Sequence, residues 1–185
     1  MANQYLVDAE ERMKKALESV RHELTGIRTG KASPGLLDTV KVEAYGSTVP
    51  IQQVGTVSAP EPRLLVVQPW DKSLIKAITR GINEANLGLY PADDGIVVRI
   101  PVPTLTEERR KELVKLISKF AEEGRVHIRQ VRHEVNKQLK DAEHSGELPE
   151  DDAKRLTAES QKLTDKYIAL IDDVLKKKTA DVMEV

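Results

Sequence analysis

The sequence predicts an α+β protein in which a small β/α/β domain is inserted into a long three-helix bundle. Two observations support this class: both ends of the chain show helical periodicity, and the middle shows strand-like alternation. The composition agrees, because charged residues make up 32% of the 185 residues and aromatic residues only 3%. That balance is typical of long exposed helices rather than of a β-sandwich.

The first predicted helix covers the N-terminal part of the chain. Its apolar residues recur at three-, four- and seven-residue intervals: Leu6, Met13, Leu17, Val20, Leu24 and Ile27. No Gly or Pro interrupts this pattern before Gly26, so we expect an amphipathic helix of about six or seven turns. Gly30 suits a left-handed cap for this helix, and Pro34 prevents the helix from resuming.

Residues 31–104 lack the long helical periodicity and are predicted to form the inserted β/α/β domain. A helix capped by Asp71 would carry Leu74, Ile75 and Ile78 and end near residues 86–88. Turns are expected at residues 45–47 and 91–95. Five runs are typical of strands: 39–44, 48–51, 54–58, 64–67 and 96–100.

Two further helices are predicted after the inserted domain. One extends from Thr106 to about residue 142, and the other begins at Pro149 with acidic residues in its first turn. Because each helix has one narrow apolar stripe, residues 1–30 and 105–185 must bury these stripes together as a bundle. The first stripe comprises Leu113, Ile117, Phe120, Gly124, Ile128, Val131, Val135 and Leu139. The second comprises Ala153, Leu156, Leu163, Tyr167, Leu170 and Val174.

The chain passes twice between the two predicted domains. One crossing contains Gly and the other follows a Pro-rich segment, which is compatible with a hinge. A rigid packed junction is an equally good interpretation of the sequence. The hinge residues would be Thr29, Gly30, Lys31, Thr104, Leu105 and Thr106.

Several classes of function are excluded by what the sequence lacks. There is no Cys, so disulfides, thiolate zinc sites and cysteine nucleophiles are impossible. The four His are not spaced as metal ligands, and no nucleophile is paired with a base. We therefore expect a protein that is not an enzyme and has no metal and no cofactor. The N-terminus does not resemble a signal peptide and no apolar run would span a membrane, so a cytoplasmic location is expected.

The positive signal is a local excess of cations in a chain whose net charge is only -1. Residues 109–132 contain eight Lys or Arg and three Glu. Within this segment Arg125, Arg129 and Arg132 share one helix face, with Asn136 next along. Guanidinium groups match phosphate oxygens, and the scarcity of aromatic residues favours folded or double-helical RNA over single strands. The alternative is that these arginines only form ion pairs within their helix, with Glu122 or Glu123.

Several short segments of the chain occur together in one known family. They are residues 27–34 (IRTGKASP), 36–38 (LLD), 45–46 (YG) followed by Pro50, 87–89 (LGL) before Pro91, 99–101 (RIP), 105–111 (LTEERRK) and 129–132 (RQVR) with Asn136. On these segments the chain resembles the bacterial ribosome recycling factors along nearly its whole length. The resemblance departs mildly at Lys31, where Arg is common, at His133, where Arg is common, and at Gly124, where Ala is usual. Gly124 could let two helices approach closely.

The resemblance implies an L-shaped monomer that binds the post-termination ribosome, mainly through large-subunit rRNA. Elongation factor G with GTP would then drive splitting into subunits, with release of mRNA and tRNA. Arg129 and Arg132 match rRNA-contacting positions of the family, whereas Arg125 is added because it shares their helix face. The complete set of predicted rRNA-binding residues is Arg28, Lys31, Arg109, Arg110, Arg125, Arg129 and Arg132.

Two rival functions remain from other classes. A helical scaffold or coiled-coil adaptor would use the three stripes for protein partners, but it leaves the inserted domain and the arginine face unexplained. A general nucleic-acid chaperone is disfavoured by the net charge of -1, because such proteins depend on an excess of positive charge.

Overall fold

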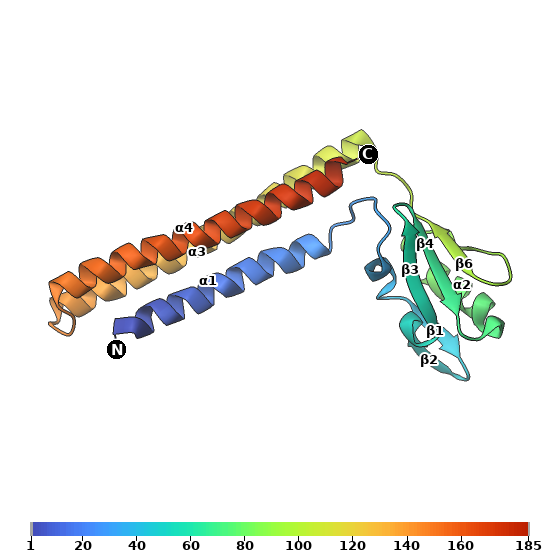
Figure 1. The fold of residues 1–185 in the computed structure, drawn as a ribbon, viewed down its shortest axis with the longest axis horizontal. Helices are drawn as coiled ribbons and strands as arrows, with labels where there is room; N and C mark the ends of the chain where they lie inside the picture. The colour runs from blue at the N-terminus through green and yellow to red at the C-terminus, as the bar shows by residue number, and fades with distance from the viewer. Residues whose placement is uncertain (1, 185) are drawn as a thin grey trace. The chain divides into compact units, whose positions relative to one another are not determined.

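The computed structural model describes residues 2–184 and divides into two compact units. The first unit is Met1–Arg28 together with Glu107–Val185, and the second is Thr29–Thr106. In the first unit, α1 (Ala2–Thr25), α3 (Glu107–His144) and α4 (Glu150–Met183) lie side by side (Figure 1). The start of α1 and the turn between α3 and α4 lie at the same end of this bundle. The predicted α+β class and the three long helices are confirmed.

The end of α1 differs from the prediction. The helix stops at Thr25, and Ile27 donates a backbone hydrogen bond to Leu24 O at 3.2 Å. Gly30 does have a positive φ of 76°, but it lies five residues beyond the helix, in the connection to the second unit. Gly30 is therefore a turn residue of the linker and not the cap of α1.

The apolar stripes of α1 and α3 are confirmed as the core of the bundle. The predicted positions of both helices are buried, apart from Phe120, which is only partly buried. On α4 the prediction is partly wrong, because Leu163, Leu170 and Val174 are only partly buried. The seam of α4 instead includes Ser160, Thr164 and Ile171, each at most 1% exposed. The leucine heptad begins on the seam at Leu156, but Leu163 and Leu170 each lie one residue before a fully buried position, Thr164 or Ile171, and so lie at the edge of the seam.

The second unit contains two antiparallel sheets. β1 (Lys41–Ala44) and β2 (Ser47–Pro50) form a hairpin. The other sheet has the order β3-β4-β6-β5, formed by β3 (Gly55–Glu61), β4 (Leu64–Pro69), β6 (Val98–Pro101) and β5 (Ala92–Asp93). The prediction missed β5, because residues 91–95 indicated only a turn. Three short 3-10 helices occupy Pro34–Leu37, Ile51–Gln53 and Lys72–Leu74.

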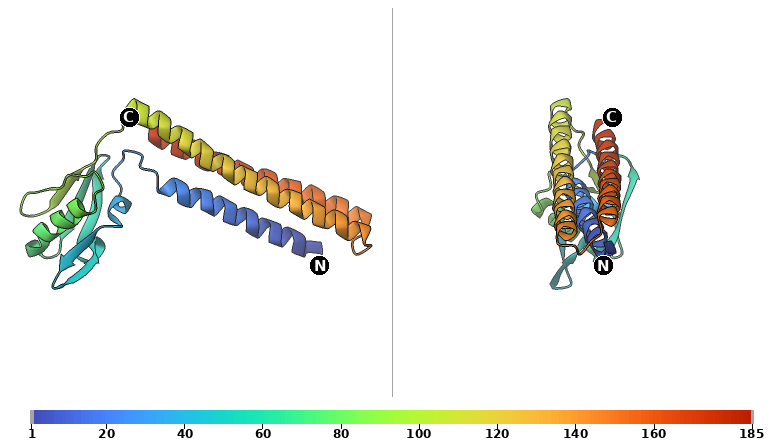
Figure 2. Two further views of the ribbon diagram at one scale, coloured as in Figure 1. Left: turned by 180° about the vertical axis from the view of Figure 1, so that it is seen from behind. Right: turned by 90° about the vertical axis from the view of Figure 1, so that its left-hand side faces the viewer.

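The helix of the second unit is α2 (Ile75–Glu84), which follows β4 and precedes β6. The predicted β/α/β order is thus confirmed, although β4 and β6 pair antiparallel rather than through a parallel crossover. Figure 2 shows α2 lying across one face of the strands. The predicted cap is present, since Asp71 Oδ1 accepts a hydrogen bond from Ser73 N at 2.9 Å. The hairpin turn is also confirmed, with positive φ at Tyr45 and Gly46, as a type I′ turn requires.

Both linkers are fastened to the turn between β3 and β4. Ala32 N donates to Pro62 O at 2.7 Å, and Val102 N donates to Arg63 O at 2.8 Å. The two linkers also contact each other, because a Cβ built on Gly30 would lie 3.1 Å from Leu105 Cγ. The backbone from Ala32 to Val102 is therefore held as part of the second unit.

Candidate nucleic-acid interface

The predicted arginine face lies on α3, and its three arginines differ in their surroundings. Arg125 faces α4, and its side chain is only 19% exposed. Its Nε and Nη2 donate to Asp172 Oδ1 at 2.8 and 2.6 Å, and its Nη1 donates to Glu122 Oε2 at 2.9 Å. Arg125 shares a helix face with Arg129 and Arg132 but is the more buried residue, because its side chain turns towards the neighbouring helix.

The electrostatics of this cluster favour the charged forms. Burial disfavours the charged guanidinium of Arg125, but the hydrogen bonds to Asp172 and Glu122 outweigh burial and raise its pKa. The hydrogen bond from Arg125, followed by the one from Arg129, holds the pKa of Glu122 below its usual value. Arg125 is therefore a charged brace between α3 and α4.

Arg129 is exposed and shares the same carboxylate. Its Nη1 donates to Glu122 Oε1 at 3.0 Å, so the ion pairing within α3 that the sequence left open as an alternative is present. Such exposed pairs add little to stability, since both groups remain hydrated. A phosphate could replace Glu122 at little cost, and the pair does not argue against RNA binding.

Arg132 is held in a different way. Its Nη1 donates to the amide oxygen Oε1 of Gln161 on α4 at 3.0 Å. Among the described residues no carboxylate lies within ion-pairing distance of Arg132. On the same helix, Asn136 has a buried Oδ1 with no hydrogen-bond partner in the described chain. Of the three arginines, Arg132 thus keeps the least compensated charge.

The remaining predicted contacts lie elsewhere. Arg109 donates to Glu112 at 2.8 Å and Arg110 to Met183 O at 3.3 Å, both at the start of α3. They lie about 24 Å along the helix from Arg125, at 1.5 Å per residue. Arg28 is exposed just after α1, and Lys31 belongs to the second unit. The structure brings together Arg125, Arg129 and Arg132 on α3, and Arg109 and Arg110 lie at a separate position on that helix.

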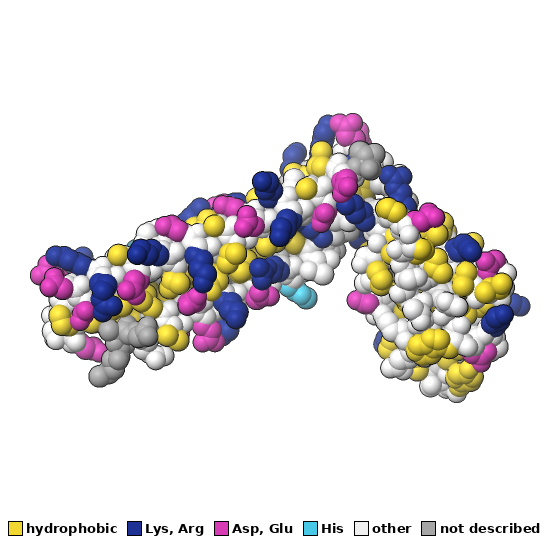
Figure 3. Space-filling model, in the orientation of Figure 1, with side chains coloured by type: hydrophobic (Ala, Val, Ile, Leu, Met, Phe, Trp, Pro, Cys, Tyr) yellow, Lys and Arg dark blue, Asp and Glu magenta, His cyan; other side chains and the backbone are white. Residues whose placement is uncertain are grey.

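The surface of the bundle is a mixture of charges rather than a continuous basic patch. Figure 3 shows Lys and Arg side chains interspersed with Asp and Glu along one face of the bundle. Many of these charges are paired along a helix, as Lys111 is with Glu107 at 2.7 Å. Recognition by this surface would therefore depend on a few particular cations and not on a general field.

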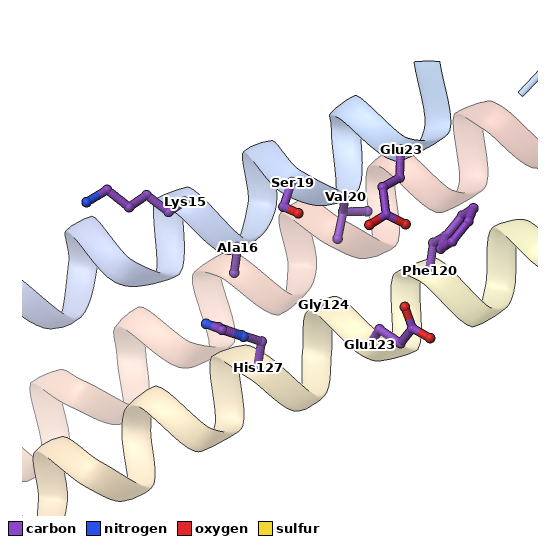
Figure 4. Close-up of a pocket in the computed structure, with 9 residues that line it drawn as sticks. All are labelled: Lys15, Ala16, Ser19, Val20, Glu23, Phe120, Glu123, Gly124 and His127. Atoms are coloured by element: carbon purple, nitrogen blue, oxygen red, sulfur yellow. The ribbon is translucent and has the colours of Figure 1, made fainter. Parts of the chain in front are cut away.

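A groove of about 330 Å³ lies between α1 and α3 (Figure 4). Lys15 and His127 line it at one end, and Glu23 and Glu123 line it towards the other. Gly124 forms part of its wall, where a Cβ would overlap Val20 Cγ2 and lie 3.0 Å from Ile171 Cδ1. The expectation that Gly124 lets two helices approach closely is confirmed.

The acidic and histidine side chains of the described residues are not grouped as a metal site. Within residues 2–184 no group of three or more potential metal ligands is found, and the four His are exposed. The adjacent Asp93 and Asp94 shape a turn, since Asp94 Oδ1 accepts from Ile96 N and Val97 N, each at 2.9 Å. In the described part of the chain, no helix combines the length and apolarity needed to cross a bilayer.

The chain is thus an α+β protein, a bundle of three long helices with an inserted unit of two sheets and one helix. The family model described as "Ribosome recycling factor" matches residues 20–183, and the chain belongs to this family. It is 52% identical to the ribosome-recycling factor of Symbiobacterium thermophilum over 185 residues, covering both chains completely. It is also 52% identical to that of Rubrobacter xylanophilus over 180 residues, 97% of each chain.

Solved structures agree with the family. A solution structure of the ribosome recycling factor is 43% identical, with a TM-score of 0.76 and coverage of 100% of this chain and 98% of that one. A second structure is 45% identical, with a TM-score of 0.65 and 99% coverage of both chains. Its title gives models for the T. thermophilus recycling factor and E. coli elongation factor G bound to the E. coli post-termination complex. Members of this family are translation factors that are not enzymes.

Proposed function

We propose that the protein binds the post-termination ribosome in the cytoplasm, as a monomer, and promotes its splitting into subunits. Elongation factor G and GTP would supply the driving force, and mRNA and tRNA would be released. The observation that carries this proposal is similarity along the whole chain to recycling factors, one of them described with elongation factor G on a post-termination complex.

The bundle would supply the main contact, with large-subunit rRNA. Arg132 and Arg129 are the best candidates for phosphate contacts, because their guanidinium groups are tied only by a neutral amide or by an exposed carboxylate. Arg125 would contribute mainly by bracing α3 against α4. The supporting contacts would come from Arg28, Lys31, Arg109 and Arg110.

The linkers would act as a hinge between the two units. The hydrogen bonds of Ala32 and Val102 hold the chain beyond them in the second unit. Rotation would therefore have to occur in the short segments outside these anchors. These segments contain Thr29, Gly30 and Lys31 on one side and Thr104, Leu105 and Thr106 on the other.

The decisive experiment measures splitting of purified post-termination ribosomes by the full chain. Splitting should require the protein, elongation factor G and GTP together, and each omission should abolish it. Cosedimentation with large subunits should accompany this activity. Binding only to other proteins would favour the scaffold alternative, and equal binding to duplex DNA would favour the general chaperone.

The hinge can be tested separately because the chain has no native Cys. A single disulfide engineered between the two units, close to the linkers, should preserve folding and ribosome binding but abolish splitting. Reduction of the disulfide should restore splitting. Full activity of the oxidised protein would contradict the hinge.

A further inference from the structure

We propose that Gln161 and Asp165 of α4 are positioning residues that hold Arg132 of α3 ready to bind an RNA phosphate. Arg132 Nη1 donates to Gln161 Oε1 at 3.0 Å, and Gln161 Nε2 donates to Asp165 Oδ1 at 2.9 Å. These two bonds join an exposed carboxylate, an amide and a guanidinium in one chain across two helices. The proposal rests on the proposed function, in which Arg132 contacts rRNA.

The direction of the two hydrogen bonds follows from the chemistry of the three groups. An ionised carboxylate can only accept, so Asp165 binds the NH2 group of Gln161 and leaves the amide oxygen facing away. A guanidinium can only donate, so it pairs with that oxygen. Asp165 thereby fixes which end of the amide Arg132 meets, although it does not contact Arg132 itself.

A neutral partner suits a residue that must bind phosphate. Gln161 takes up one donor of Arg132 and leaves the other N–H groups of the fork available, without cancelling the positive charge. Arg125 and Arg129 instead have carboxylate partners. The amide therefore orders the side chain of Arg132 before binding. Less side-chain entropy is then lost when the complex forms.

The test is a set of affinity measurements with isolated large ribosomal subunits across a range of salt concentrations. Gln161→Ala should weaken binding by about two- to tenfold, as expected when one flexible side chain must be ordered on binding. The salt dependence should stay unchanged, because Arg132 keeps its charge. Arg132→Ala should weaken binding and also lower the salt slope by about one.

The double variant identifies positioning directly. Adding Gln161→Ala to Arg132→Ala should cause no further loss, because no guanidinium remains to be positioned. Asp165→Asn should give a smaller loss than Gln161→Ala, since an Asn can bind either end of the amide. The matched control is Gln138→Ala, because Gln138 is an exposed glutamine of α3 with no hydrogen-bond partner among the described residues.

The outcomes separate this proposal from the proposed function. If Arg132→Ala weakens binding and Gln161→Ala does not, the positioning role is wrong and the RNA contact stands. The positioning role is also wrong if Gln161→Ala causes the same loss with and without Arg132, or lowers the salt slope. If Arg132→Ala binds like the unmodified chain, the Arg132 contact of the proposed function fails, and the positioning role fails with it.

Discussion

The two units of this protein are stabilised in different ways. The core of the second unit consists entirely of aliphatic side chains, many of them fully buried, such as Leu65, Ile78 and Ile100. The bundle instead buries Ser160 and Thr164 in its seam. Its helices are also joined by charged contacts: Arg12 with Glu134, Glu10 with Lys166, and Arg125 with Asp172.

The charged contacts of the bundle follow from its elongated helices, and they affect which residues can bind a partner. Three long helices share one narrow seam, so most of their residues face solvent and many charges must be placed there. Some of these charges connect helices, and others remain available to a partner. A basic residue on the bundle therefore cannot be assigned to RNA from its position in the sequence alone, as Arg125 shows.

Val131→Asp should have the largest effect, because Val131 is fully buried in the seam of the bundle. An unpaired carboxylate there should lower the free energy of unfolding by about 3–5 kcal/mol. The matched control is Val126→Asp on the same helix, where the side chain is 52% exposed and the change should stay within about 0.5 kcal/mol. Helical circular dichroism reports the bundle, and fluorescence of the single tryptophan, Trp70, reports the second unit.

If the units are stabilised independently, Val131→Asp should lower the helical transition and leave the Trp70 transition nearly unchanged. Equal shifts of both transitions would show that the two units unfold as one and are not stabilised independently.

Arg132→Glu tests which surface charges serve a partner. It replaces a phosphate-matching cation by an anion and should weaken large-subunit binding by about 1–3 kcal/mol. Stability should change by no more than about 0.5 kcal/mol, as for other surface positions. Lys137→Glu changes the charge equally on another face of α3, where Lys137 is exposed, and should be much milder. Equal losses would mean that only net charge matters.

Substitution of one glycine in each unit tests how closely the elements of that unit pack. A Cβ at Gly124 would overlap the side chain of Val20, whereas a Cβ at Gly81 would overlap the backbone oxygen of Lys41. Overpacking lowers the free energy of unfolding by about 1–3 kcal/mol. Replacing Gly by Ala within a helix raises it by about 1 kcal/mol. Gly124→Ala should therefore be mildly destabilising, and Gly81→Ala should cost more because β1 cannot shift without breaking its pairing. A larger loss for Gly124→Ala in chemical denaturation would contradict this order.

The sequence predicted the elements far better than the contacts between them. Helical periodicity identified α1 and α3 to within a few residues, because each buries a regular stripe. On α4 it identified the helix and part of the stripe, but a heptad of leucines suggested Leu163 and Leu170 although the seam passes through Ser160, Thr164 and Ile171. Their spacing of four and seven residues is helical, but Ser160 and Thr164 are polar, and polar residues do not indicate burial. The pairing of β4 with β6 and the two-residue strand β5 depend on contacts distant in the sequence.

The candidate site shows the same limit. The spacing of Arg125, Arg129 and Arg132 correctly placed them on one side of α3. No pattern within α3 could show that Asp172 and Gln161, from another helix, would become partners of Arg125 and Arg132. The family resemblance does not separate these roles either, because it matches positions and not contacts.

The smallest expected effect is a difference between the units in acid. In the bundle, hydrogen bonds from Arg12 to Glu134, from Arg125 to Glu122 and from Lys166 to Glu10 lower the pKa of each carboxyl from a usual value of 4.5. In the second unit, the hydrogen bond from Tyr45 lowers the pKa of Asp71, and backbone N–H groups lower that of Asp94, both from 3.8.

A carboxyl whose pKa is lower in the folded state stabilises the fold above its unfolded pKa and loses that contribution as the pH falls through its folded pKa. The loss should therefore begin near pH 4.5 for the bundle and near pH 3.8 for the second unit. Denaturant midpoints from helical circular dichroism should begin to fall at a higher pH than midpoints from Trp70 fluorescence. Glu134→Gln should reduce the acid sensitivity of the helical midpoint, since an amide does not titrate. An earlier fall of the Trp70 midpoint would show that the ion pairs between helices do not set the acid response of the bundle.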